Sequence, residues 1–485
     1  MKSNWNHYAK EVLSAAMKEN NVTASALAER LNSDGCSETK ASIDNKISRG
    51  SFSASFLYHC LYCLNHKDYS ADTLLKSGSF ITLPLQAGGQ YFSQNKGIGF
   101  LTPPVVGGSR LKRNKVISLF TGTGGFDIGL EQAGFSTAAC VEIDDHCRET
   151  LRHNRPQWKL LEANDGRIPG DIRQISGDEI LKVAGLNKGE AALVVGGAPC
   201  QPFSNIGLKE GENDSRNGDL FLEFVRVVND TAPNAFIFEN VTGITQAKHA
   251  AVISYMEKKF SEIGYKISYS IINAADYGVP QKRQRFIILG LKGSGAPSFP
   301  MPTHAKDFKH WALFVDSLNH FPDYVPVGWK TVGDAFGELP SCYKSRLDYK
   351  QMNVSEIIKN RMKLIGPGEN FKVLPHSMRP NCWKSGKHLG QDTFGRLKLS
   401  EPSVTIRTAA YNPTKGRYIH PTEHRGLDLI EMSCLQSFPL DWEFKCANNK
   451  PITLKSGGAQ IGNAVPPLLA RALGDALYSQ LSYLE

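Results

Sequence analysis

Five short apolar runs between Lys115 and Gly290 alternate with stretches long enough to form a helix. The runs are VISLF, TAACVEI, ALVVGG, AFIFENV and RFIILGL. Strands that recur with helix-length segments between them are typical of βαβ units, in which helices cover a mostly parallel sheet. This pattern predicts an α/β domain over residues 115–290, with the rest of the chain before and after it.

The segments on either side of that domain differ from it in composition and in the pattern of apolar residues. Residues 1–75 contain short helical stretches, and residues 76–114 have the Gly- and Pro-rich composition of a linker. Residues 291–395 are irregular and rich in Pro, Gly, aromatic and basic residues, which predicts a smaller inserted domain. Residues 396–485 return to compact structure and end in the apolar helical run PPLLARALGDALYSQL. A chain of 485 residues is long enough for several such domains.

Composition restricts the compartment and the partners. Lys and Arg number 56 against 47 Asp and Glu, and this surplus favours a polyanionic partner. The ten cysteines lack a disulfide-like spacing, which suits a reducing compartment. We find no run long enough to cross a bilayer, and the start MKSNWNHYAK lacks the apolar core of a signal peptide, so we expect a cytoplasmic protein without a membrane partner. Cys60 and Cys63 form a single CxxC pair, for which core packing is expected rather than a metal site.

Residues 8–65 resemble a helix-turn-helix domain of the phage-repressor type. Thr23 is placed to cap the helix TASALAERLN, and residues 39–50 follow as a second helix. The side chains expected to reach a DNA groove are Lys40, Lys46 and Arg49. The alternative is a small helical domain that serves only for packing.

The first apolar run leads into a glycine turn, FTGTGG, that precedes a helix-forming segment. Glycines at this place let a ligand approach the backbone, but the spacing is not that of a dinucleotide fingerprint. Glu142 ends the second run, where nucleoside-binding sheets supply a carboxylate for ribose hydroxyls. Asp171 is expected to end a third strand and to face an adenine amino group. These features predict a nucleoside cofactor without a pyrophosphate, such as S-adenosylmethionine; an ordinary turn with a surface glutamate is the alternative.

Further motifs place reactive side chains at strand ends. GGAPCQPFS follows a buried run and holds Cys200 in a turn stiffened by prolines. FENV ends a strand with Glu239 in the crevice where open α/β sheets bind ligands. QKRQR leads into another strand, and Arg283 and Arg285, two residues apart, are expected to point to the same face. GNAV precedes the last helix.

Together these motifs resemble those of the bacterial DNA (cytosine-5) methyltransferase family. Their order is FTGTGG, Glu142, Asp171, GGAPCQPFS, FENV, QKRQR, the EPSVTIRT to LQSFP region, and GNAVPP, over roughly residues 115–480. The resemblance implies a Rossmann-like sheet of mixed strands that binds S-adenosylmethionine and carries catalysis. It also implies a target-recognition domain, at residues 291–395, with double-stranded DNA in the cleft between the two.

The resemblance also assigns roles to single residues. Cys200 would add to C6 of a flipped-out cytosine, Glu239 would bind N3 and the exocyclic amine, and Arg285 would bind O2. Arg283 would support the thiol side or the loop at residues 205–221 that closes over DNA. The cofactor would be bound by Phe120, Gly122, Thr123, Gly125, Glu142, Asp171, Ile172, Pro199, Leu220, Asn463 and Val465. DNA contacts are expected from Ser204 and, in the recognition segment, from Arg379 and Lys384 together with the aromatic Trp383.

Two other functions fit the same residues. A tRNA cytosine-C5 methyltransferase shares the catalytic order, although a sizeable recognition segment favours DNA. The chain could instead act mainly as a transcriptional regulator that binds its own promoter through residues 1–75. A cognate restriction endonuclease is a further possible partner. Ile430 and Cys434 stand where arginines are frequent in the family, at positions with a structural role.

Overall fold

The structure is a computed structural model that describes two compact units. The first comprises Met1–Ser93 with Pro302–Gly328, and the second comprises Gln94–Met301 with Trp329–Glu485. The described residues are 113–163, 166–198, 219–245, 250–293, 295–307, 326–384 and 392–482, with shorter pieces between Lys10 and Leu64 and at 100–101, 111 and 390.

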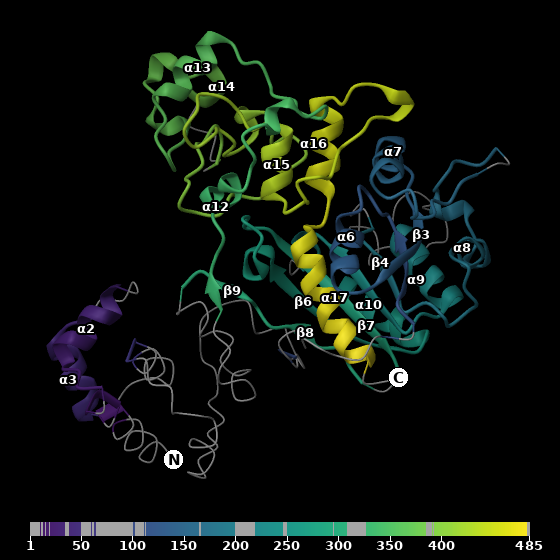
Figure 1. Ribbon diagram of the computed structural model, residues 1–485, viewed down its shortest axis with the longest axis horizontal. Helices are drawn as coiled ribbons and strands as arrows, with labels where there is room; N and C mark the ends of the chain where they lie inside the picture. The colour runs from purple at the N-terminus through teal and green to yellow at the C-terminus, as the bar shows by residue number, and fades with distance from the viewer. Residues whose placement is uncertain are drawn as a thin grey trace. The chain divides into compact units, whose positions relative to one another are not determined.

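A six-stranded sheet forms the centre of the second unit (Figure 1). Its spatial order is β3 (Ser136–Val141), β2 (Lys115–Leu119), β4 (Leu193–Gly196), β5 (Ala235–Asn240), β7 (Gln284–Lys292) and β6 (Tyr265–Asn273). The first four strands in this order are parallel, and β7 is antiparallel to both of its neighbours. The predicted α/β class with a mixed, mainly parallel sheet is therefore confirmed.

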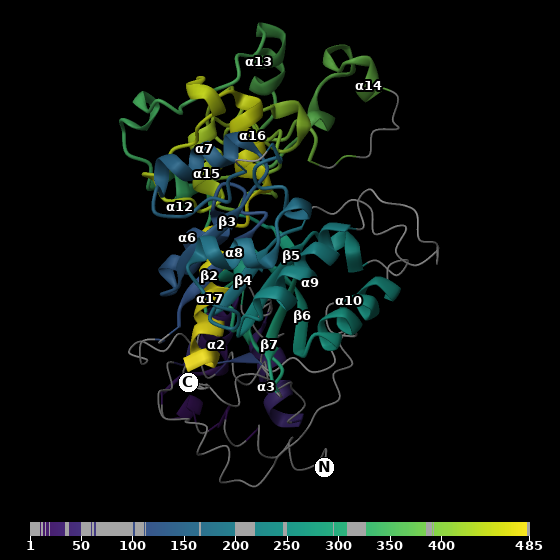
Figure 2. The ribbon, with the colours of Figure 1, turned by 90° about the vertical axis from the view of Figure 1, so that its right-hand side faces the viewer.

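Helices cover both faces of the sheet (Figure 2). One face packs against α8 (Gly177–Ala184), α9 (Asp219–Thr231) and α10 (Ala250–Glu262). The other packs against α6 (Gly125–Gln132) and α17 (Pro467–Ser482). Since α17 comes from the end of the chain and lies beside α6 from its first third, the C-terminal segment completes the same domain.

The sheet differs from the sequence prediction in two places. The strand β6 was not among the predicted runs, because Lys266, Ser268 and Ser270 interrupt its apolar residues as suits a strand at the edge. Asp171 does not end a strand, so that prediction is wrong. Its side chain accepts a hydrogen bond from the amide of Arg173 and caps the short 3₁₀ helix η1 (Ile172–Gln174). The third strand of the six-stranded sheet in chain order is β4.

The remainder of the second unit consists of short helices joined by longer irregular segments. It contains α7 (Asp145–Asn154), α12 (Val332–Gly337), α13 (Glu356–Lys363), α14 (Asn381–Lys384), α15 (Leu429–Leu435) and α16 (Leu454–Asn463). Short 3₁₀ helices lie at Thr242–Thr245, Ala274–Tyr277, Tyr343–Ser345, Phe371–Val373, His376–Met378, Pro413–Lys415 and Ala447–Asn449. A core cluster joins α12 and α15 to Ile128 and Trp158 of the sheet domain. The domain boundaries at 291–395 and 396–485 stay predictions.

The segment around α13 and α14 has a small core of its own. Trp383 is only 8% exposed and lies between Phe371 and Phe394, with ring centroids 5.1 and 5.3 Å away. Its large apolar area holds the segment together. The expectation that this aromatic side chain contributes to a DNA-contacting surface stays a prediction.

Two-residue ladders pair distant parts of the chain within each unit. In the second unit β1 (Phe100–Leu101), inside the predicted linker, pairs in parallel with β8 (Phe299–Pro300). In the first unit β9 (His304–Ala305) pairs in parallel with β10 (Val327–Gly328). Most of the predicted linker at 76–114 lies outside the described residues.

The first unit also contains α2 (Ala24–Ser33) and α3 (Lys40–Arg49). The hydroxyl of Thr23 accepts a hydrogen bond from the amide of Ala26 at 3.3 Å, which confirms the predicted cap. Cys60 is fully buried in the small core of this unit, as its apolar neighbours predicted. Within the described residues, no helix combines the length and the apolar composition needed to span a bilayer.

Candidate active site

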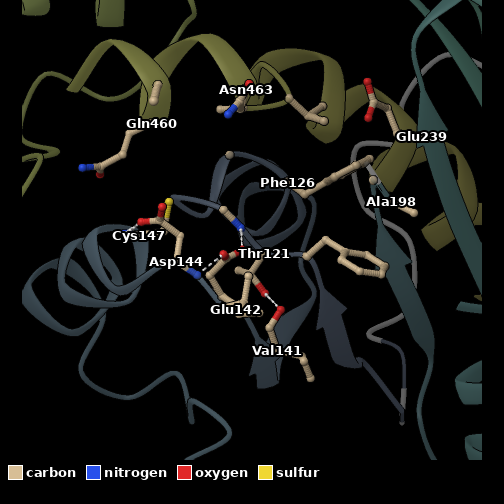
Figure 3. A pocket seen from close by; sticks show the side chains of 18 of the residues that line it. Thr121, Phe126, Val141, Glu142, Asp144, Cys147, Ala198, Glu239, Gln460 and Asn463 are labelled. Atoms are coloured by element: carbon tan, nitrogen blue, oxygen red, sulfur yellow. Dashed lines mark hydrogen bonds between the residues drawn. The ribbon is translucent and has the colours of Figure 1, made fainter. Parts of the chain in front are cut away.

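A cavity of about 700 Å³ opens at the carboxyl ends of β2, β3, β4 and β5 (Figure 3). Residues from the start of β7 and from the segment before α17 close it on the other side. The predicted site residues that line it are Phe120, Gly122, Gly125, Glu142, Asp171, Ile172, Leu220, Glu239, Arg283, Arg285, Asn463 and Val465. Residues that are hundreds of positions apart in the sequence thus share one cavity.

Of the four other residues predicted for the catalytic centre and its surroundings, the structure describes one. Thr123 is buried in the glycine turn, and its hydroxyl has no hydrogen-bond partner among the described residues. Pro199, Cys200 and Ser204 lie outside the described residues. The same described parts of the chain contain no group of three or more His, Cys, Asp or Glu side chains that could hold a metal ion.

The glycine turn after β2 brings backbone rather than side chains to the cavity. Phe120 and Gly122 have φ angles of 53° and 57°, in the left-handed region that is uncommon for a residue such as Phe120 and is often found at functional sites. Gly125, the first residue of α6, faces the segment before α17. A Cβ atom on Gly125 would lie 2.2 Å from the carbonyl oxygen of Val465, so only glycine allows the two chains to meet here.

Glu142 is held at the cavity wall by backbone amides (Figure 3). Its two carboxylate oxygens accept hydrogen bonds from the amide of Gly122 at 2.6 Å and from that of Asp144 at 2.8 Å. Burial raises the pKa of Glu142, and the two amides oppose that effect. An ionised carboxylate has about four acceptor positions, so positions remain for the hydroxyl groups of a ligand.

Asp171 lines the same end of the cavity and forms an ion pair with Arg173. Arg173 donates to both carboxylate oxygens of Asp171, each at 2.9 Å, and Gln174 donates to one of them at 3.1 Å. The Arg173 side chain is the main reason that the pKa of Asp171 lies below its ordinary value. The neighbouring Ile172 is buried and adds an apolar wall. The expected contact with an adenine amino group stays a prediction.

At the other end of the cavity Glu239 and Arg285 form an ion pair. The Arg285 Nε atom lies 2.7 Å from Oε1 of Glu239, and each side chain is 13% exposed. Burial raises the pKa of Glu239, while Arg285 and then Arg283 lower it. A Cβ atom on Gly197 would lie 2.6 Å from the second carboxylate oxygen, Oε2. The chain that leaves β4 toward Cys200 therefore passes directly beside the Glu239 carboxylate.

Arg283 is bound to backbone carbonyls. Its Nη1 atom donates to Ile406 at 3.0 Å, and its Nη2 atom donates to Gly462 at 2.9 Å and to Ala464 at 3.0 Å. The side chain is buried, and its Nε atom has no hydrogen-bond partner among the described residues. The guanidinium thus binds segments that lie more than a hundred residues further along the chain.

The cavity also has a wall that the sequence did not indicate. It is formed by Ile143, Asp144, His146 and Cys147 on one side and by Ser456, Ala459 and Gln460 of α16 on the other. Ile143 is 49% exposed directly after the strand-end acid, and an apolar residue next to Glu142 is a signal that could have been used. The residues of α16 carry no such signal, because only the fold brings Gln460 to α7, where it accepts a hydrogen bond from Thr150 at 2.6 Å.

The described residues that were predicted to contact DNA are divided between the two units. Lys40 and Lys46 belong to the first unit, where Lys46 pairs with Glu38. In the second unit Arg379 donates to the carbonyl of Leu374 at 2.9 Å, and Lys384 is exposed at the end of α14. The side chain of Arg49 lies outside the described ones. The roles of these residues stay predictions.

Comparison with known proteins shows which family the chain belongs to. A family model described as C-5 cytosine-specific DNA methylase matches residues 114–479. The chain belongs to this family. It is therefore an enzyme of the DNA (cytosine-5-)-methyltransferase class, and the matched region of this methylase contains the whole cavity described above.

Curated relatives match over most of their own length. The type II methyltransferase M1.HphI of Haemophilus parahaemolyticus is 33% identical over 368 residues, which cover 74% of this chain and 86% of that protein. The type II methyltransferase M.XorII of Xanthomonas oryzae pv. oryzae is 34% identical over 387 residues, which cover 75% and 84%.

A solved structure supports the fold. The crystal structure of a DNA modification methyltransferase encoded within a prophage of E. coli superposes with a TM-score of 0.52 at 24% identity, and it covers 76% of this chain and 99% of that one. A second family model, a domain of unknown function (DUF6471), matches residues 5–69 of the methylase. The helix-turn-helix assignment of this region therefore stays a prediction.

Proposed function

We propose that this methylase transfers a methyl group from S-adenosylmethionine to C5 of a cytosine that is flipped out of double-stranded DNA. The observation that supports this proposal best is the shared cavity. Glu142 and Asp171 line one end of it, and the Glu239–Arg285 ion pair lines the other. A nucleoside-type cofactor and a cytosine ring therefore have complementary groups within one cavity.

The first end of the cavity fits the nucleoside part of S-adenosylmethionine. Glu142 has acceptor positions for ribose hydroxyls, and Ile172 and Ile143 provide apolar surface for a purine ring. The backbone at Gly122 is open, because a Cβ atom there would meet no atom within 4 Å. When bound, S-adenosylmethionine supplies an electrophilic methyl group. Asn463 and Val465 would complete its site from the segment before α17.

The second end provides the groups that activate cytosine. C5 of cytosine is a weak nucleophile, so the thiolate of Cys200 would add to C6 and place electron density on C5. Arg285 would donate to O2 and Glu239 would bind N3 and the exocyclic amine. After C5 has accepted the methyl group, removal of the C5 proton lets the C6–S bond break and returns the thiolate. C6 is inaccessible in a stacked base pair, which is why the base must leave the helix.

The state of the Glu239 carboxyl matters for this step. N3 of neutral cytosine is an acceptor, so Glu239 must bring a proton to hydrogen-bond with it. Burial favours the protonated form by raising the pKa of Glu239, and Arg285 favours the ionised form. A cytosine whose O2 accepts a hydrogen bond from Arg285 would weaken the Glu239–Arg285 ion pair and shift Glu239 toward protonation.

Methyl transfer to duplex DNA compared with transfer to tRNA tests the proposal against its nearest alternative. The full chain is incubated with S-adenosylmethionine labelled in the methyl group and with either unmethylated genomic DNA or a tRNA pool. We expect label in DNA, and label confined to tRNA would contradict the proposal. Cys200→Ser should abolish the transfer, whereas Cys342→Ser, at an exposed cysteine, serves as the matched control and should remain active.

The first unit is the basis of a second, separate proposal. We propose that residues 1–75, whose helices α2 and α3 belong to a unit distinct from the catalytic one, bind the promoter of the methylase's own gene. A gel-shift assay with the full chain tests this, and Lys40→Glu should weaken a shift that depends on α3. A restriction endonuclease with the same recognition sequence is the expected partner of a methylase of the type II class.

A further inference from the structure

We infer that Arg283 is a positioning residue that fixes the Gly462–Ala464 backbone and thereby sets the affinity for the cofactor. The inference rests on the proposed function, because it takes Asn463 and Val465 as part of the cofactor site. It separates Arg283 from Arg285, two residues further on, which would act on the base.

The hydrogen bonds of Arg283 bracket Asn463. The Nη2 atom donates to the carbonyls of Gly462 and Ala464, which flank Asn463 in the chain, at 2.9 and 3.0 Å. The Asn463 side chain itself lies at the cavity (Figure 3). Hydrogen bonds from a guanidinium are about twice as strong as neutral ones, and here they are shielded from water. The backbone on both sides of Asn463 is therefore held by one cation.

A pair of buried glutamines supports the same backbone. Gln436 donates to the Ala464 carbonyl at 2.6 Å and accepts a hydrogen bond from Gln281 at 2.5 Å. The Gln281 side-chain oxygen accepts from the amide of Ile406 at 2.9 Å, and the Ile406 carbonyl accepts from Arg283. These hydrogen bonds link residues 281–283 to Ile406 and to the Gly462–Ala464 backbone. Both glutamines are fully buried.

Tight packing transmits the position of this backbone to the glycine turn. A Cβ atom on Gly462 would lie 2.3 Å from the amide nitrogen of Thr408, so the segment cannot move toward residues 407–408. The next carbonyl along the chain, that of Val465, lies 2.2 Å from the position of a Cβ on Gly125. A shift of the Gly462–Ala464 backbone would therefore reach Gly125, and interiors packed this closely transmit such shifts.

Arg283 and Arg285 have different partners despite their proximity. The partners of Arg283 are backbone carbonyls, whereas the Nε atom of Arg285 pairs with the Glu239 carboxylate. Burial and the like charge of Arg285 lower the pKa of Arg283 to about 9, which still leaves it protonated at neutral pH. The structure thus connects Arg283 to the cofactor end of the cavity and Arg285 to the base end.

The experiment measures cofactor affinity separately from turnover. Dissociation constants for S-adenosylmethionine are determined by calorimetry with the full chain in the absence of DNA, and kcat is measured at saturating S-adenosylmethionine. Arg283→Lys keeps a cation but cannot span all three carbonyls, so we expect the dissociation constant to rise about tenfold. The kcat value at saturation should stay within about threefold of wild type. Arg285→Lys should show the reverse, with unchanged cofactor affinity and a lower kcat.

A second variant covers the case in which Arg283→Lys does not fold, as thermal unfolding would reveal. Gln436→Met leaves Arg283 in place and removes the other donor to the Ala464 carbonyl, together with the acceptor for the Gln281 side chain. It should raise the dissociation constant about threefold, by the same route. Unchanged cofactor affinity in the folded variants would overturn the inference, as would a loss of kcat at saturation without a loss of affinity. If the wild-type chain itself fails to bind S-adenosylmethionine, the proposed function fails and the inference fails with it.

Discussion

Replacing Gly125 with alanine tests how closely the cofactor wall depends on the C-terminal segment. The added methyl would lie 2.2 Å from the Val465 carbonyl oxygen, whereas real Cβ atoms essentially never come closer than 3.0 Å to another heavy atom. Either α6 or the backbone near Val465 must therefore move by close to an ångström. Forcing extra volume into a packed interior costs about 1–3 kcal/mol of stability. A shift of this size in a wall of the cavity should also weaken cofactor binding by about tenfold or more.

Gly129→Ala is the matched control on the same helix. Its Cβ atom would also lie 2.2 Å from a carbonyl oxygen, that of Pro467, but Gly129 does not line the cavity. Both variants should lower the midpoint of chemical denaturation, and Gly129→Ala should lower it at least as much, because its Cβ atom would also lie 2.5 Å from the amide nitrogen of Arg471. Only Gly125→Ala should raise the dissociation constant for S-adenosylmethionine in calorimetry. Equal losses of affinity in both variants, or wild-type affinity in Gly125→Ala, would refute the reasoning.

Three further perturbations have defined outcomes. Glu239→Gln removes the acid beside N3 and should lower kcat about 100-fold or more with cofactor affinity unchanged, and a wild-type kcat would count against its role. Burial raises the pKa of Asp127 from 3.8 to about 7, so the stability that this carboxyl contributes is present below about pH 4 and is lost as the pH rises to about 7. The difference in unfolding free energy between Asp127→Asn and the wild type, measured in urea, should therefore shift in favour of the variant by up to about 4 kcal/mol from pH 4 to pH 7. A difference that does not depend on pH would contradict this. Trp383→Ala should cost about 3–5 kcal/mol of unfolding free energy; a loss of DNA binding at unchanged stability would instead make Trp383 a DNA contact.

The sequence predicts the sheet because its inner strands are apolar on both faces. Runs such as ALVVGG and AFIFENV become β4 and β5, and Glu142 and Glu239 lie at strand ends as expected. The edge strand β6 is not predicted in this way, since one of its faces is only partly covered and its sequence mixes polar with apolar residues. Strand-end acids are therefore predictable wherever the strand itself is.

The partners of a polar side chain are much harder to predict. Arg283 and Arg285 look equivalent in QKRQR, but one binds three carbonyls and the other binds Glu239. These carbonyls come from the C-terminal part of the chain, so no local pattern in the sequence identifies them. The same holds for Gln460, whose place at the cavity depends on how α16 packs against α7.

Asp171 and Trp383 show a related difficulty. Asp171 was expected at a strand end, but an acid followed by a short helical turn caps that turn with its side chain. Trp383 stands among basic residues, which suggested a DNA-binding surface, but its large apolar area is buried against two phenylalanines. Composition alone does not distinguish a core aromatic residue from an exposed one.

The central claim is that this methylase modifies C5 of cytosine in DNA through Cys200. Bisulfite sequencing of DNA from cells that express the protein tests it most directly, because the method detects cytosines that carry a C5 modification and shows their sequence context. The account predicts protected cytosines at one recurring sequence in cells that express the wild-type chain and in cells that express Cys342→Ser, and no protection with Cys200→Ser. Protection that persists with Cys200→Ser, or an absence of protected cytosines with the wild-type chain, would contradict it.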